Sequence, residues 1–144
     1  PLWLIGKKRG EVARSVGLRF SRDPRFCGEA LGILSRNVRR GDGDLLMRLG
    51  RSVRRYGRET RQRIYNAVLG AYQDADPNDI SRDVLFLLYE DVFCSHCRCR
   101  CVELMRRTGM VPRAILEECR YDSGMELREF AERELNAMEM RKGG

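Results

Sequence analysis

The chain has few of the residues and motifs that mark an enzyme. Its 144 residues include one histidine, His96, and one tryptophan. His96 precedes Cys97, and sequence neighbours in a helix point about 100° apart, so this pair is not placed to act as base and nucleophile. A Gly-rich phosphate loop, an HExxH motif and a serine-centred elbow are also missing. We therefore expect a protein that is not an enzyme.

Membrane and strand signals are scarce as well. The sequence has no run of about 20 apolar residues that would span a bilayer, and it shows no secretory leader. No alternating run is bounded by turn residues, and no repeat recurs at a solenoid period. We expect an intracellular location, in the cytoplasm or at a mitochondrial or other membrane surface. Association with a membrane would then use a segment outside this chain.

Helix punctuation, in contrast, recurs along the chain and predicts an all-α fold. The expected fold is a single domain over residues 1–144, built as a bundle of seven or eight helices joined by short connections. Residues 77–108 count in this prediction as one helix or as a near-continuous pair. The expected helices cover residues 2–20, 24–41, 44–57, 60–74, 77–108, 112–119 and 123 onward.

The most apolar stretch is Val84–Leu88, which is followed by Tyr89. A helix that is apolar all round is buried, so this segment predicts a central hydrophobic helix over about residues 77–95. Asp76 can cap its start and Pro77 suits the first helical position. Gly109 is the next glycine and can close the helical stretch.

Six cysteines are present, but four of them lie within the segment CSHCRCRC. Such close thiols cannot staple distant segments, and they suit a reducing compartment. Thiols that share a helix face behave as small hydrophobes, so we expect no cofactor. Zinc is the alternative, although a second pair of ligands is missing. A redox role stays open too, because Arg98 and Arg100 favour thiolates nearby. The candidate metal ligands are Cys94, Cys97, Cys99 and Cys101.

The chain carries a formal net charge of +7, mostly through arginines spread along its length. Such a balance suits nucleic acid, anionic membranes or acidic partners, and also ordinary solvated helix faces. One alternative function is therefore a basic all-α nucleic-acid-binding protein, such as a viral RNA-interacting factor. The candidate phosphate contacts are three arginine pairs near predicted helix ends, where the helix dipole also favours cations: Arg39 and Arg40, Arg54 and Arg55, Arg106 and Arg107.

Three consecutive segments in the middle of the chain follow a recognisable order. Tyr72–Ala75 gives an aromatic helix end and an acidic turn, Asp79–Arg82 is a tetrapeptide ending in arginine, and VLFLLYEDVF is an apolar helix. This order resembles the B-cell lymphoma 2 family of apoptosis regulators, in which an Asn-Trp-Gly-Arg tetrapeptide precedes the central helix. Ile80 stands where that family has tryptophan.

A second family motif, the death helix, is matched poorly. Gly41-Asp42 resembles its end, but Arg40 and Asn37 stand where it has apolar residues. Residues 122–126 only faintly resemble a further motif near the family's C-terminus. The resemblance therefore implies a survival-type receptor for death-motif helices, more than a donor of one. It also implies a viral member of the family that acts in host–virus interaction.

The resemblance also implies how such a protein would work. An amphipathic helical segment of a pro-apoptotic partner would lie in a hydrophobic groove with its anchors at i, i+3/i+4 and i+7. Arg82 would pair with the partner's aspartate, a charge-assisted contact. The alternative role of Arg82 is an ion pair with Asp79 or Asp83. The implied groove lining is Leu46, Leu49, Val53, Val68, Tyr72, Val84 and Leu85.

Overall fold

The computed structural model describes residues 10–23, 25–34, 36–109 and 111–142. Within these ranges it contains eight α-helices, three short 3₁₀ turns and no strand, so the predicted all-α class is confirmed. Residues 2–9 of the first expected helix lie outside the described residues. The helices are α2 (Glu11–Phe20), α3 (Cys27–Leu34), α4 (Gly43–Ser52), α5 (Arg58–Gln73), α6 (Arg82–Asp91), α7 (Ser95–Arg107), α8 (Arg113–Cys119) and α9 (Met125–Lys142).

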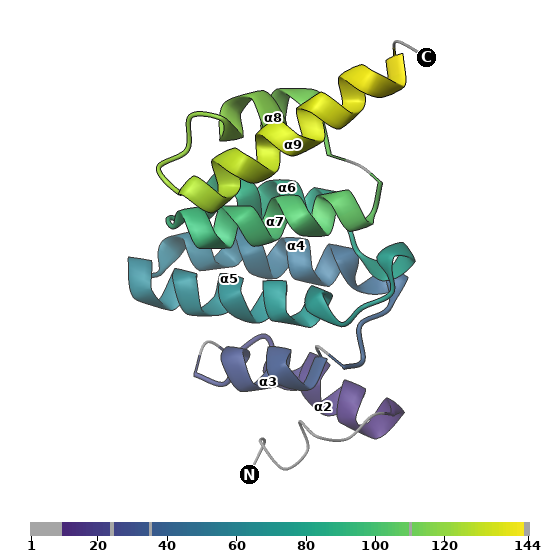
Figure 1. Ribbon diagram of the computed structural model, residues 1–144. Coiled ribbons are helices and arrows are strands. Elements are labelled where there is room, and N and C mark those ends of the chain that lie inside the picture. The colour runs from purple at the N-terminus through teal and green to yellow at the C-terminus, as the bar shows by residue number, and fades with distance from the viewer. Residues whose placement is uncertain (1–9, 24, 35, 110, 143–144) are drawn as a thin grey trace.

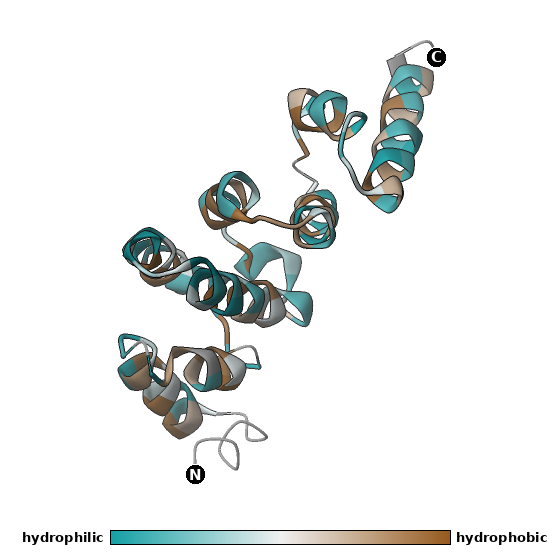
Figure 2. Ribbon diagram, turned by 90° about the vertical axis from the view of Figure 1, so that its left-hand side faces the viewer, coloured by the Kyte–Doolittle hydropathy of each residue, from teal (hydrophilic) through white to brown (hydrophobic). Residues whose placement is uncertain are grey.

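The helices are stacked in pairs, with α2 and α9 in the two end layers of the stack (Figure 1). Consecutive helices pair, α2 with α3 and so on to α8 with α9, and the layers meet where α3 packs on α5, α4 on α6, α5 on α7 and α7 on α9. Figure 2 shows the layers stepping sideways as they rise, with hydrophobic and hydrophilic residues on different sides of the helices. The described residues therefore form the predicted all-α bundle, with eight helices arranged as stacked hairpins in which each layer mainly contacts its neighbours.

The apolar stretch forms α6, in the third layer of the stack, where it packs on α4 and α7. Val84, Leu85 and Leu88 are at most 1% exposed. The packing on α4 is close at Gly50, because a Cβ atom there would lie 2.5 Å from Cδ2 of Leu87. The predicted burial of this helix thus follows from its contacts within the stack.

The boundaries of α6 are tighter than the predicted 77–95. Asp76 does act as a cap, and its carboxylate accepts from the backbone N–H of Asn78 at 2.8 Å, but it opens a 3₁₀ turn over Pro77–Asp79. The helix itself begins only after Ser81, whose hydroxyl accepts from the N–H of Val84 at 3.5 Å. The chain leaves the helix at residue 92 and reverses into α7, so the near-continuous pair is a hairpin (Figure 1).

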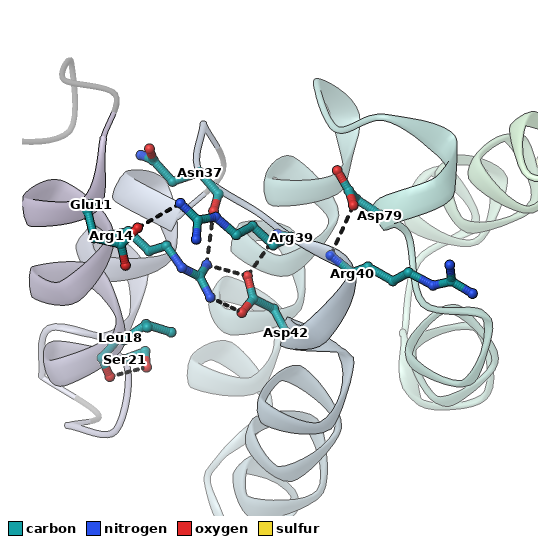
Figure 3. A network of polar contacts seen from close by, with 9 residues as sticks. All are labelled: Glu11, Arg14, Leu18, Ser21, Asn37, Arg39, Arg40, Asp42 and Asp79. Atoms are coloured by element: carbon teal, nitrogen blue, oxygen red, sulfur yellow. Dashed lines mark hydrogen bonds and ion pairs between the residues drawn. The ribbon is translucent and has the colours of Figure 1, made fainter.

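A polar network explains why α3 ends at Leu34 rather than near Gly41 (Figure 3). The guanidinium of Arg14, on α2, donates to both carboxylate oxygens of Asp42 and to the backbone carbonyl of Asn37 at 3.0 Å. The same carboxylate accepts from the backbone N–H of Arg39 at 2.9 Å. These bonds hold the connection between the first two layers, in which Arg39 is extended and Arg40–Asp42 form a 3₁₀ turn.

The C-terminal end of α5 is held by α7. Arg107 donates to three backbone carbonyls at the C-terminal end of α5, those of Tyr72 (3.4 Å) and Gln73 (2.7 Å) in its last turn and that of Ala75 (2.9 Å) just beyond it. Gly109 has φ +70°, the left-handed conformation that ends a helix, as the sequence predicts. The ends of α5 and α7 are therefore fixed to each other.

Within the described ranges, no helix combines the length and the apolar character that crossing a bilayer requires.

Candidate functional site

A groove with a volume of about 1030 Å³ lies between the first half of α5 and the start of α7. The α-helical period puts Arg58, Gln62 and Asn66 on one face of α5 at i, i+4 and i+8. Helix α7 begins directly after the hairpin turn and supplies the opposite wall. The lining is Arg58, Glu59, Gln62, Arg63, Asn66, Phe93, Cys94, His96, Cys97 and Arg100.

The groove is basic at its rim and mainly apolar inside. Arg58, Arg63 and Arg100 face one acidic residue, Glu59, so positive charges outnumber negative ones in the lining. Phe93 leaves 39% of its surface exposed, which is unusual for a phenylalanine. The guanidinium carbons of Arg58 and Arg61 lie 5.0 and 4.5 Å from its ring centroid, within cation–π distance. Such a groove suits a ligand that has both apolar groups and negative charge.

Two thiols form part of the groove wall. Cys94 is the N-cap of α7, and its sulfur accepts from the backbone N–H of Cys97 at 3.2 Å. The two Sγ atoms are 2.7 Å apart, and the Cys97 thiol donates onward to Oδ1 of Asn66 at 3.2 Å. The side-chain amide of Gln62 donates to the Cys97 sulfur at 2.9 Å. Burial, reinforced by the neighbouring Cys94 thiol, raises the pKa of Cys97 to about 11.

The residues that the family resemblance implies as groove lining do lie together, but they form part of the hydrophobic core. All seven residues belong to one cluster of buried side chains between α4, α5 and α6, and none is more than 7% exposed. A partner helix could reach them only if these helices separated. The seven buried residues are Leu46, Leu49, Val53, Val68, Tyr72, Val84 and Leu85.

Arg82 lies elsewhere, at the exposed start of α6. It borders a separate recess of about 520 Å³, whose other walls include Arg40, Asp79 and Asp83. This lining is mostly polar, so the surface beside Arg82 is not the apolar groove that the resemblance implies.

The three arginine pairs predicted for phosphate contact are mostly occupied within the chain. Arg39 pairs with Glu11 at 2.6 Å, Arg54 pairs with Asp91 at 2.6 Å, and Arg107 holds the end of α5. Arg55 lies over the ring of the next residue, a tyrosine, at 5.3 Å. Arg40 and Arg106 have exposed side chains. Most of these arginines therefore make contacts within the stack of helices and are not free to bind a ligand.

The candidate zinc ligands do not gather at one point. The sulfurs of Cys94 and Cys97 are 2.7 Å apart, and Cys99 and Cys101 are buried, as Cys97 is, at 3% and 0% exposure. Burial raises the pKa of Cys99 to about 11 and that of Cys101 further. In the part of the chain that the structure describes, no group of three or more His, Cys, Asp or Glu side chains could hold a metal ion.

Sequence reasoning found one wall of the groove and missed the other. The cysteine segment pointed to Cys94 and Cys97, but Arg58 and Arg63 read as an ordinary basic helix face. A usable signal was the i, i+4 row of polar residues on α5 together with Phe93, an aromatic residue next to a turn. Compared with known proteins, the chain matches no family model, no curated protein and no solved structure.

Proposed function

We propose that the protein is a non-enzymatic binding module whose α5/α7 groove takes an acidic amphipathic helix from a partner protein. The observation that carries the proposal is the pairing of an exposed aromatic ring, Phe93, with a rim of Arg58, Arg63 and Arg100. An acidic amphipathic helix offers the complementary chemistry, apolar anchors flanked by carboxylates. Stacked helical hairpins also provide extended surfaces of the kind used for protein binding.

The size of the groove limits what can enter it. About 1030 Å³ is at the upper end of the range for drug-sized ligands, so the groove accepts several side chains from one helix face. Apolar anchors one turn apart would contact Phe93, and carboxylates beside them would reach the arginines. Exposed ion pairs contribute only about 0.2–1 kcal/mol each, so the apolar contacts supply much of the affinity and the charges supply selectivity.

The resemblance to the B-cell lymphoma 2 family supports the choice of first ligand. Death-motif helices carry apolar anchors and an aspartate, which is the character that this groove requires. The proposal keeps the helix-in-groove mechanism and moves it from the filled α4–α6 core to the α5/α7 surface. Arg82 has no part in this version, since it borders a different recess.

Fluorescence anisotropy with a labelled acidic amphipathic peptide tests the proposal. Arg63→Glu should weaken binding about ten-fold, because it removes an attraction and adds a repulsion worth about 1.4 kcal/mol together. Arg133→Glu is the matched control, because it makes the same charge change at an exposed site on α9 and should change the affinity less than about two-fold. Phe93→Ala should also weaken binding.

Two outcomes would contradict the proposal. Equal losses in Arg63→Glu and Arg133→Glu would mean that net charge, not the groove, attracts the peptide. Tighter binding of single-stranded RNA, with a steep salt dependence and no effect of Phe93→Ala, would instead support the nucleic-acid alternative.

A further inference from the structure

The second feature of the groove is its pair of thiols, which differ sharply in exposure. Cys94 is exposed at the start of α7, whereas Cys97 is 3% exposed and lies directly behind it. Their sulfur atoms are 2.7 Å apart. The other four cysteines are all at most 3% exposed, so Cys94 is the thiol that a reagent in the groove would meet first.

We propose that Cys94 and Cys97 form a reversible dithiol–disulfide site that reacts with anionic low-molecular-weight disulfides of the glutathione type. The Cys94 thiolate attacks one sulfur of the reagent RS–SR, which forms a Cys94–SR mixed disulfide and releases RS⁻. The Cys97 thiolate then attacks the Cys94 sulfur and releases the second RS⁻. The two protein thiols are thereby oxidised, the reagent is reduced to two thiols, and the two cysteine protons go to the leaving thiolates.

The surroundings favour attack by Cys94 first. The backbone N–H of Cys97 points at the Cys94 sulfur, and the amide of Gln62 points at the Cys97 sulfur, so a hydrogen-bond donor faces each sulfur although burial raises the pKa of Cys97. Cys97 is held as a buried thiol until Cys94 has reacted, which fixes the order of attack. Arg63 and Arg100 line the same groove and attract a reagent that carries carboxylates.

The reaction of the two thiols does not depend on peptide binding, because it needs only the pair of sulfur atoms and an open approach to them. Failure of peptide binding would leave the thiol chemistry in place, and the thiol assay uses no peptide.

The test incubates the full chain in glutathione buffers of increasing oxidised fraction, followed by acid quenching, alkylation and tryptic mass mapping. Cleavage after Arg82 and Arg98 isolates residues 83–98, which contain Cys94 and Cys97 and no other cysteine. The expected product is this peptide lighter by two hydrogens, with no attached glutathione. Cys97→Ser should stop at a glutathione adduct on Cys94, Cys94→Ser should not react on the same timescale, and Cys119→Ser should behave as the wild-type protein.

The charge of the reagent gives a second readout. Arg63→Glu should slow the reaction with oxidised glutathione about ten-fold and leave the reaction with cationic cystamine no slower. A stable glutathione adduct in the wild-type protein, a disulfide that involves another cysteine, or no reaction even in fully oxidised buffer would each overturn the proposal. If circular dichroism shows that Cys97→Ser does not fold, the wild-type mapping decides the question alone.

Discussion

Asp42→Ala should destabilise the protein far more than an ordinary loss of an ion pair. The Asp42 and Arg14 side chains are only 8% and 11% exposed, and the carboxylate accepts from the Arg14 guanidinium twice and from the Arg39 N–H once (Figure 3). Alanine would leave the guanidinium with one remaining contact in this network, the carbonyl of Asn37. Removing one partner of a buried pair costs about 3–5 kcal/mol.

The matched control is Asp23→Ala, which removes the same type of carboxylate from an exposed pair. Arg25 and Asp23 are 78% and 30% exposed and 2.7 Å apart, so solvent screens this pair and it adds little to stability. At about 2–4 °C of melting temperature per kcal/mol for a chain of this size, Asp42→Ala should lower the melting temperature by about 10 °C and Asp23→Ala by less than about 3 °C. Thermal denaturation followed by circular dichroism measures both.

The layered arrangement also predicts where in the chain the destabilisation should occur. Since the main contacts join neighbouring layers, the damage from Asp42→Ala should concentrate in α2 and α3. Hydrogen exchange should accelerate there and stay nearly unchanged in α8 and α9. Equal melting shifts for the two variants, or acceleration spread evenly over all layers, would refute the reasoning.

Two other perturbations probe the remaining layers. Arg107→Ala removes three bonds to carbonyls at the C-terminal end of α5 and should cost about 1.5–3 kcal/mol in urea denaturation, whereas Arg106→Ala, at the neighbouring exposed position, removes none of these bonds and should cost less than about 0.5 kcal/mol. Equal costs would contradict the bracing role of Arg107. At Asp122 burial opposes ionisation, but bonds from Ser95 and Gly124 and nearby arginine charge hold its pKa below the usual value. Its carboxylate therefore stabilises the fold above about pH 4 and loses this effect as the pH falls through the lowered pKa. Asp122→Asn should be less stable by about 1.5–3 kcal/mol at pH 7, and the difference from wild type should shrink in acid; a gap that does not depend on pH would contradict this.

The sequence predicted the helices better than their arrangement. The run Val84–Leu88 identified a buried helix because an all-round apolar surface has few other stable placements. The pairing of layers was not predictable, because it depends on surface fit such as the approach of α6 to Gly50 on α4, and hairpins can stack without a repeating sequence. Asp76 and Pro77 predicted the start of an α-helix, and Asp76 does act as a cap. The element that it caps is a 3₁₀ turn, because such a turn favours the same residues at its start.

The candidate site was only half predictable for a related reason. Apolar residues of α4, α5 and α6 look alike in sequence whether they line a groove or fill a core, and here they fill the core. The groove joins residues 58–66 to residues 93–100, and no local pattern reveals that these segments face each other. The sequence does not distinguish arginines that pair with other residues of the chain from arginines that line a groove. Their neighbours in the structure make the distinction.

A charge-swap experiment tests most directly whether the α5/α7 groove binds acidic helices selectively. Binding of an acidic peptide and of a lysine-substituted counterpart would be measured by anisotropy against the wild-type protein and Arg63→Glu. We expect the acidic peptide to prefer the wild-type protein and the lysine peptide to bind Arg63→Glu more tightly than the acidic peptide does. If Arg63→Glu weakens both peptides alike, or changes neither, the groove is not the surface that recognises them.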